Sequence, residues 1–307
     1  MTTGERFLII GGSNKCGTTS LFRYLGAHPD VRLSTTKEAR FFYRNQHLDA
    51  AEVLQDYRKL FSAPGDSQSV CVEASPTYLH GAEAVATNIH RTLPAANLLF
   101  LLRDPAKRLV SYYKSKFRQL DSHVGEIDFA GFVRIGLAAC TKNRRSLDAR
   151  ESAFRQELTM AKYVDFLPAF IDVFGCQQVG IYFFEDLIDD SRKFVYSVCD
   201  FVGLDANAYA SYEFTIENKT RYHRSAHIRK FATRFNERFE RSLNHLPLAR
   251  KALRKIYDLA NAKPSTEIFV DPDAYNDVVE YYREPNRQLR DLLTSTYPGL
   301  ALPYWLE

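Results

Sequence analysis

The strongest constraint on the fold is a glycine-bracketed loop that follows the first apolar segment. Residues 7–10 are all apolar, and the loop after them reads Gly11-Gly12-Ser13-Asn14-Lys15-Cys16-Gly17-Thr18-Thr19-Ser20. A helical pattern begins directly after the loop. In a strand–loop–helix unit, glycines let the backbone curl so that successive N–H groups and the helix N-terminus point at an anion. The loop therefore predicts a phosphate-binding site.

This loop differs from the nucleotide triphosphatase motif GxxxxGK[ST] at one position. Gly12 and Gly17 have the spacing of that motif, but Thr18 stands where the motif requires a lysine. The lysine of this loop is Lys15, and a lysine inside the arc of the loop reaches a different point on the ligand than one that opens the helix. An ATP-dependent P-loop kinase stays an alternative, with magnesium dependence as the property that would distinguish it.

Short apolar runs alternate with helical patterns along the chain. The apolar runs lie at 7–10, 70–72, 98–102 and 179–184. Because they are apolar on both faces, they are typical of buried strands in a parallel sheet. The helical patterns lie at 19–25, 50–60, 82–93, 105–120 and 152–174. The alternation predicts an α/β fold, with a central parallel sheet flanked by helices in a P-loop-like nucleotide-binding arrangement. We expect a single domain over residues 1–307.

Composition excludes several classes of protein. Hydrophobic residues make up 45% of the 307 residues and charged residues 25%, which is ordinary for a globular chain and excludes disorder and collagen. The formal charge of +4 is too small to indicate nucleic acid as a partner. The five cysteines contain no CxxC pair and indicate reduced thiols rather than a disulfide framework or a metal site. Because no run reaches the ~18–20 apolar residues of a membrane span, we expect a cytoplasmic protein.

Residues 219–263 are strongly basic. They contain thirteen Lys or Arg and three Asp or Glu, in a helical pattern with periodic aromatic residues. One interpretation is a solvated amphipathic helix whose aromatic face lies in the core of the domain. The alternatives are a basic flap over an anionic ligand and a helix in peripheral contact with a membrane surface.

A second motif follows the third apolar run. It reads Leu101-Leu102-Arg103-Asp104-Pro105, and the helix after it carries Ser111. Asp104 and Pro105 form a favourable helix start. The guanidinium of Arg103 offers a fork of hydrogen-bond donors suited to phosphate oxygens, and Ser111 adds a hydroxyl.

Together the loop and this turn resemble those of sulfotransferases that use 3′-phosphoadenosine 5′-phosphosulfate (PAPS), in the heparan-sulfate and bacterial carbohydrate-type branch. The resemblance implies that Lys15 contacts the bridging oxygen between phosphate and sulfate and takes part in catalysis. It implies that Arg103 and Ser111 bind the 3′-phosphate. It further implies that the 5′-phosphate is bound by the rest of the loop, namely Cys16, Gly17, Thr18, Thr19 and Ser20.

Residues 37–42 look like a segment on the acceptor side of this family. They read KEARFF, and in the family a glutamate before paired aromatic residues acts as the general base on the acceptor. That residue is Glu38 here; its alternative role is a surface carboxylate paired with Lys37 or Arg40. Arg40 stands where many members have a histidine, and it is the candidate for holding an anionic acceptor.

Residues 72–78 are similar to the family segment Glu-Lys-[ST]-Pro-x-Tyr, which lines the acceptor cleft. They read VEASPTY, so the resemblance implies that Ser75 and Tyr78 contact the acceptor. Ala74 replaces the lysine of the glycosaminoglycan enzymes, which argues against a heavily sulfated polysaccharide. Two vaguer similarities are residues 218–220, before the family's adenine-side loop, and residues 280–286, in its last helix.

The predicted reaction is in-line transfer of a sulfuryl group from PAPS to a hydroxyl, less readily an amine. The acceptor classes open to it are a glycan, a glycolipid and a small metabolite, and the second product is adenosine 3′,5′-bisphosphate. No metal is implied. Besides the kinase, the remaining alternative is a non-enzymatic basic protein that binds membranes or nucleic acid through residues 219–263; its binding would fall steeply with salt.

Overall fold

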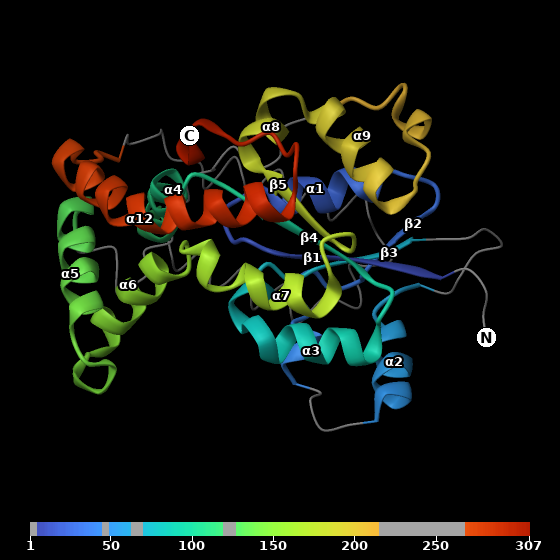
Figure 1. Ribbon diagram of the computed structural model, residues 1–307, viewed down its shortest axis with the longest axis horizontal. Coiled ribbons are helices and arrows are strands. Elements are labelled where there is room, and N and C mark those ends of the chain that lie inside the picture. Colours follow the sequence, from blue (N-terminus) through green and yellow to red (C-terminus); the bar gives the residue numbers. More distant parts are fainter. Residues whose placement is uncertain (1–4, 45–48, 63–69, 119–126, 215–267) are drawn as a thin grey trace, which may run out of the picture. The chain divides into compact units, whose positions relative to one another are not determined.

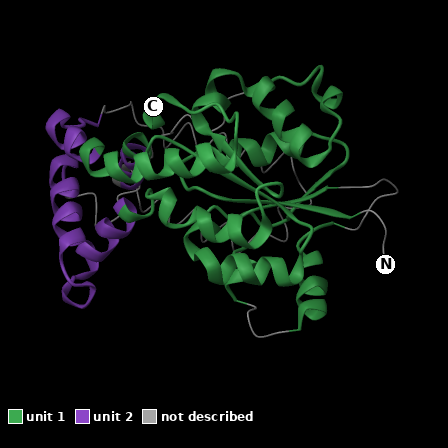
Figure 2. Ribbon diagram, viewed as in Figure 1, with its two compact units in different colours: residues 1–108, 159–217, 279–307 green, residues 109–158, 218–278 purple. Residues whose placement is uncertain are grey.

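The computed structural model describes residues 5–44, 49–62, 70–118, 127–214 and 268–307. The chain divides into two compact units (Figure 2). The first unit comprises residues 1–108, 159–217 and 279–307, and the second comprises residues 109–158 and 218–278. The prediction of a single domain stays a prediction. The basic segment 219–263 lies outside the described residues.

The first unit is built on a five-stranded parallel sheet in the order β2-β3-β1-β4-β5. Its strands are β1 (Arg6–Gly12), β2 (Val31–Leu33), β3 (Val70–Ala74), β4 (Asn97–Leu102) and β5 (Val179–Phe183). The predicted α/β class with a central parallel sheet flanked by helices is confirmed. The sequence patterns missed β2, because its three residues include Arg32 and form no apolar run.

Helices cover both faces of this sheet (Figure 1). On one side lie α1 (Thr18–Leu25), α8 (Phe184–Asp189) and α9 (Ser191–Val202), and on the other lie α3 (Ala82–Thr92) and α7 (Leu167–Phe174). Leu8 of β1 belongs to a buried cluster with Leu21 of α1 and Val195 of α9. On the opposite face the ring of Phe100 packs against Phe170 of α7 with 4.7 Å between centroids. Burial on both faces explains why the strand residues are apolar without alternation.

The first unit also contains the part of α12 (Pro272–Thr296) from residue 279 onward and several short elements. The short elements are α2 (Ala50–Arg58) and the 3₁₀ turns η1 (Phe41–Tyr43), η2 (Tyr78–Gly81), η4 (Tyr163–Asp165), η5 (Ala206–Tyr209) and η6 (Tyr304–Leu306). The prediction of one helix over 152–174 is wrong. The structure has α6 (Ala149–Thr159), then η4, then α7, with Pro168 in the first turn of α7. A proline is tolerated best in the first turn of a helix, because further in its ring clashes with the previous turn and it lacks an N–H.

The second unit is helical within the described residues. It contains α5 (Phe129–Thr141), the turn η3 (Arg144–Ser146), most of α6, the part of α4 (Pro105–Arg118) from residue 109 onward, and the start of α12 (Pro272–Thr296). Its core is aromatic: the ring of Phe132 lies 5.5 Å from that of Tyr113 and 4.6 Å from that of Phe154. No helix among the described residues is long and apolar enough to span a membrane.

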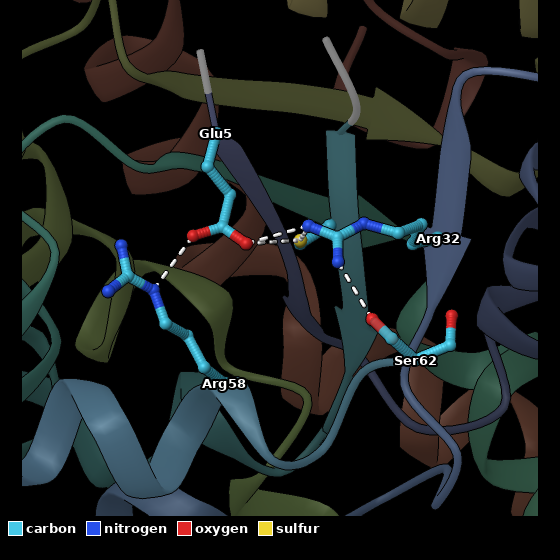
Figure 3. A network of polar contacts seen from close by, with 5 residues as sticks. Glu5, Arg32, Arg58 and Ser62 are labelled. Atoms are coloured by element: carbon cyan, nitrogen blue, oxygen red, sulfur yellow. Dashed lines mark hydrogen bonds and ion pairs between the residues drawn. The ribbon is translucent and has the colours of Figure 1, made fainter. Parts of the chain in front are cut away.

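A network of ion pairs holds the edge of the sheet at the amino ends of the strands (Figure 3). One oxygen of Glu5 accepts a hydrogen bond from Arg32 of β2 at 2.6 Å, and the other accepts one from Nε of Arg58 at 2.8 Å. Arg32 also donates to the main-chain oxygen of Ser62 at 2.8 Å. The network therefore joins the start of β1, strand β2 and the end of α2.

Candidate active site

The glycine loop connects β1 to α1 at the carboxyl end of the central strand, as predicted. Gly17 has a φ of 90°, and no side chain of the described residues caps α1 there. A Cβ on Gly17 would lie 2.8 Å from Leu187 and 2.9 Å from Phe184, so the position requires glycine for both conformation and space. The first N–H groups of α1 and its partial positive charge are therefore available to an anion.

Two arginines after β4 fix the main chain of this loop. Arg103 donates from Nη1 to the main-chain oxygen of Lys15 at 3.1 Å, and Arg108 donates from Nε to that of Asn14 at 3.1 Å. The guanidinium of Arg103 also lies over the ring of Phe184, 4.3 Å from its centroid. The motif that contains Arg103 thus meets the motif that contains Lys15.

Arg108 is a site residue that the sequence patterns missed. Its side chain is 0% exposed, although it lies in the first turn of α4, at the positive end of the helix. A cation at that end is unfavourable unless something offsets it. An arginine in the first turn of a predicted helix was therefore the sequence feature that could have identified Arg108.

Asp104 organises the turn between β4 and α4. Its Oδ1 accepts hydrogen bonds from the N–H groups of Ala106 at 2.9 Å and Lys107 at 3.2 Å, which confirms the predicted helix cap. Its Oδ2 accepts one from the hydroxyl of Tyr304 at 2.6 Å, and its own N–H donates to Glu185 at 3.2 Å. The direction in which Arg103 leaves the strand is therefore fixed from two sides.

The groups around the loop are suited to phosphate oxygens. The Nε of Arg103 and the hydroxyl of Ser13 are buried and have no hydrogen-bond partner among the described residues. Lys15 and Thr19 are half-buried, and Thr18 and Ser20 are buried. Buried donors of this kind cost free energy unless a partner satisfies them, and an anionic ligand supplies acceptors.

Ser111 lies on the part of α4 that belongs to the second unit, whereas Arg103 belongs to the first. Ser111 is half-buried. A joint role of the two residues in binding a 3′-phosphate stays a prediction.

The thiol of Cys16 packs inside the protein. It is fully buried, with its Sγ 3.8 Å from the hydroxyl of Tyr163 and 3.5 Å from the main-chain oxygen of Asn14. Burial raises the pKa of this thiol, although Arg108 opposes the shift. A direct contact of Cys16 with a nucleotide stays a prediction.

Glu38 and Arg40 lie in an exposed segment before η1. The side chain of Glu38 is 40% exposed and forms ion pairs with Lys37 at 3.0 Å and Arg40 at 3.7 Å. The pairing that the sequence offered as its alternative role is therefore present. The main-chain N–H of Glu38 donates to the oxygen of Ala74 at 2.8 Å, which places this segment at the carboxyl end of β3.

Ser75 and Tyr78 are buried, and their hydroxyls bind the main chain of the same segment. The hydroxyl of Ser75 accepts a hydrogen bond from the N–H of Arg40 at 2.9 Å, and that of Tyr78 accepts one from the N–H of Phe42 at 3.2 Å. The N–H of Ser75 donates to the oxygen of Ile10 at 3.2 Å, just before the glycine loop. Acceptor contact by Ser75 and Tyr78 stays a prediction; the geometry shows that both hold the segment of Glu38 and Arg40.

The carboxyl ends of β1, β3 and β4 thus carry the predicted residues of the first unit. Parallel α/β sheets bind their ligands at this edge. Among the described residues, no group of three or more His, Cys, Asp or Glu side chains could hold a metal ion.

Comparisons with known proteins identify the family. The chain matches the model of the sulfotransferase domain over residues 5–245. It is 28% identical over 190 residues to a bifunctional heparan sulfate N-deacetylase/N-sulfotransferase of Drosophila melanogaster, which covers 57% of this chain and 17% of that protein. It is 25% identical over 248 residues to carbohydrate sulfotransferase 15 of Homo sapiens, which covers 64% of this chain and 43% of that protein. The chain therefore spans less than half the length of these relatives.

A solved structure has a similar fold. The sulfotransferase from Alicyclobacillus acidocaldarius has a TM-score of 0.62 and 21% identity, over 98% of both chains. The chain belongs to the sulfotransferase domain family. This assignment does not favour the kinase or the non-enzymatic basic protein as alternatives.

Proposed function

We propose that the chain transfers a sulfuryl group from PAPS to a hydroxyl of a glycan, a glycolipid or a small metabolite, with an amine as the less favoured acceptor. The observation that carries the choice of PAPS is the hydrogen bond from Arg103 to the main-chain oxygen of Lys15 at 3.1 Å. It joins two candidate phosphate-binding motifs that are 88 residues apart in the chain. A nucleotide with phosphates at both its 5′ and 3′ positions would use both motifs.

The 5′-phosphosulfate is assigned to the glycine loop. The uncapped N-terminus of α1 supplies N–H groups, Thr18, Thr19 and Ser20 supply hydroxyls, and Lys15 supplies a positive charge. The 3′-phosphate is assigned to Arg103, whose buried Nε has no partner among the described residues, together with Ser111. Every one of these groups donates hydrogen bonds, which suits a polyanion.

The reaction is a direct displacement at sulfur. The acceptor oxygen forms a bond to sulfur while the bond from sulfur to the phosphate oxygen breaks, and its electron pair stays on that oxygen. Lys15 and the loop N–H groups stabilise the charge that grows on the leaving phosphate. Glu38 takes the acceptor proton, and its partly exposed side chain is accessible for this role. The products are a sulfate ester and adenosine 3′,5′-bisphosphate.

Arg40 is assigned to the acceptor. Its side chain is 53% exposed and lies beside Glu38. A guanidinium at that place suits an acceptor that carries a carboxylate or another anionic group. Ala74, which stands where a lysine is expected, leaves fewer cations for a heavily sulfated polysaccharide.

A thermal-shift panel tests the choice of PAPS. Adenosine 3′,5′-bisphosphate, ADP and ATP with Mg²⁺ are compared at equal concentrations. A ligand at about 100 times its Kd stabilises the folded state by about 2.7 kcal/mol, so we expect a clear shift with the bisphosphate and a small one with ADP. A shift with ATP that depends on Mg²⁺ and exceeds the shift with the bisphosphate would refute the proposal. Transfer of labelled sulfate from PAPS to a panel of hydroxyl acceptors then tests the reaction itself.

A further inference from the structure

Glu73 is a buried carboxyl at the end of β3. Its side chain is fully buried, and it lies opposite Ile9 in the register of β3 with β1. It interrupts a strand that is otherwise apolar or small, VCVEA. A buried carboxyl is unfavourable unless hydrogen bonds compensate it, so the partners of Glu73 show what it does.

Ser75 is the partner that connects Glu73 to the acceptor side of the site. The hydroxyl of Ser75 donates to Oε1 of Glu73 and accepts from the N–H of Arg40 at 2.9 Å. A serine hydroxyl has one hydrogen and two lone pairs. Donation to Glu73 therefore directs its lone pairs, one of which receives the Arg40 N–H.

The segment that Ser75 holds has an unfavourable backbone conformation. Glu38 has a φ of 60° and Arg40 a φ of 52°, in the left-handed region that residues other than glycine avoid. Such a conformation persists only where the surroundings fix it. Here three hydrogen bonds do so, from the N–H groups of Glu38, Arg40 and Phe42 to partners in residues 74–78.

We propose that Glu73 is a positioning residue for sulfuryl transfer. It orients the hydroxyl of Ser75, which fixes the backbone at Arg40 and with it the direction of the Glu38 side chain. The proposal rests on the proposed role of Glu38 as the base. Glu73 itself is fully buried and acts through Ser75.

The surroundings of Glu73 give this role a pH dependence. The titratable and charged side chains near its carboxyl are Tyr57 from α2 and Tyr78 from η2, with the more distant charge of Lys37; β1 contributes the apolar Ile9. Oε2 of Glu73 has no hydrogen-bond partner among the described residues, so the bond to Ser75 holds this carboxyl through Oε1. Burial raises the pKa of Glu73 to about 7, against the hydrogen bond from Ser75.

Above this pKa the carboxylate accepts the hydrogen of Ser75. Below it, Glu73 is protonated, and the hydroxyl of Ser75 loses the charged acceptor that orients it toward Arg40. The kcat of the wild type should therefore rise with pH through about 7.

Three variants test the proposal in the full chain. Ser75→Ala removes the connection, and Glu73→Gln keeps an acceptor for Ser75 but cannot titrate. Ser197→Ala is the control, because its hydroxyl donates to the main-chain oxygen of Phe194 within α9, outside the predicted site. The measurements are hydrogen exchange at the Arg40 amide, kcat, and the affinity for adenosine 3′,5′-bisphosphate.

We expect Ser75→Ala to speed exchange at Arg40 and to lower kcat by about 10–100-fold, because small displacements of a reacting group cost this much. Its affinity for the bisphosphate and all three properties of Ser197→Ala should stay at wild-type values. Glu73→Gln should lose the rise of kcat through about pH 7. If Ser75→Ala fails to fold, the pH profile of kcat for Glu73→Gln tests the proposal on its own.

Equal kcat and equal Arg40 exchange in Ser75→Ala and Ser197→Ala would overturn the proposal, as would a wild-type pH profile in Glu73→Gln. Failure of the proposed function gives a different result. In that case the wild type itself would not bind adenosine 3′,5′-bisphosphate or transfer sulfate from PAPS. Neither outcome that overturns the role of Glu73 affects those two wild-type properties.

Discussion

The buried side chain of Arg108 donates a hydrogen bond from Nε to the main-chain oxygen of Asn14 at 3.1 Å. This contact places a permanent positive charge against the glycine loop, at the residue before Lys15. Together with Arg103, it holds the main chain of the loop and supplies positive charge beside it. Preorganised charge of this kind avoids reorganisation during the reaction.

Arg108→Met should lower the affinity for every nucleotide that has a 5′-phosphate. The variant keeps much of the volume of the side chain and removes its charge and its bond to Asn14. Hydrogen bonds that involve charged groups contribute about 1.5–3 kcal/mol, so we expect affinity for adenosine 3′,5′-bisphosphate and for AMP to fall together by about tenfold or more. Calorimetric titration measures both. A loss limited to the bisphosphate would show that Arg108 does not act through the loop.

Arg103 and Ser111 should differ in how they discriminate between nucleotides. Arg103 also holds the main-chain oxygen of Lys15. Arg103→Ala should therefore lower the affinity for the bisphosphate by about 10–100-fold and should also lower the affinity for AMP. Ser111→Ala should lower the affinity for the bisphosphate and leave the affinity for AMP unchanged. Titration of each variant with both nucleotides checks this, and equal affinity of the wild type for the two nucleotides would contradict the assignment of the 3′-phosphate.

Lys15 should affect turnover more than binding. Its charge is assigned to the leaving phosphate, where the interaction grows in the transition state. We expect Lys15→Ala to lower kcat by about 10²–10³-fold with a much smaller change in affinity for the bisphosphate. Lys15 has a φ of 68°, so Lys15→Gly serves as a control that removes the amine and relaxes the backbone. If the two variants differed strongly, the backbone rather than the charge would be responsible.

The thiol of Cys16 should be inert in the folded protein. It is fully buried, and burial raises its pKa, so the reactive thiolate is scarce. An aromatic disulfide reagent should therefore label the half-buried Cys140 and Cys176 first and Cys16 only after unfolding. Mass spectrometry of the labelled peptides identifies the modified residues. Rapid labelling of Cys16 under native conditions would contradict the packing described for the loop.

The ion pairs of Glu5 should make stability depend on acid pH. Burial opposes ionisation of Glu5, but the hydrogen bonds from Arg32 and Arg58 lower its pKa below 4.5. A lowered pKa stabilises the fold above the unfolded-state value of about 4.5 and loses that effect as the pH falls through the folded-state value. Glu5→Gln should therefore be less stable than the wild type near neutral pH, and the difference should shrink in acid.

We expect this difference to be about 1 kcal/mol, because the network is partly exposed and solvent screens it. Denaturant unfolding at several pH values measures it. Lys59→Ala, which removes an exposed pair with Asp56 at the end of α2, is the control and should leave stability unchanged at every pH. A constant difference between Glu5→Gln and the wild type down to strong acid would argue against the ion pairs.

The sequence predicts the sheet well because four of its strands are buried on both faces. Such strands are apolar runs, and β1, β3, β4 and β5 lie where those runs lie. Strand β2 escapes this signal because its residues are only partly buried and Arg32 serves the Glu5 network. The break between α6 and α7 was missed because apolar residues continue through it, and Tyr163 turns inward to donate to the oxygen of Arg103 at 2.9 Å.

The site is predictable where short motifs carry it. The glycine loop, Arg103 and the segment of Glu38 lie at the expected edge of the sheet. The contacts that hold them depend on the tertiary structure. Arg108 and Glu185 bind residues that are far away in the sequence, Asn14 and Asp104. Glu73 acts on the segment of Arg40 through the buried hydroxyl of Ser75. No local sequence pattern predicts such contacts. A charged residue inside an apolar strand, or a cation in the first turn of a helix, nevertheless indicates a residue with an unusual partner.

The bond between Tyr304 and Asp104 has a consequence for the order of folding. The two residues are 200 positions apart, and a ribosome makes the chain from its N-terminus. A nascent chain that has emerged as far as Phe183 contains every strand of the sheet, yet Asp104 still lacks the hydroxyl that completes its turn. The scaffold can therefore assemble during translation, whereas the turn that aims Arg103 is completed only after residue 304 has left the exit tunnel.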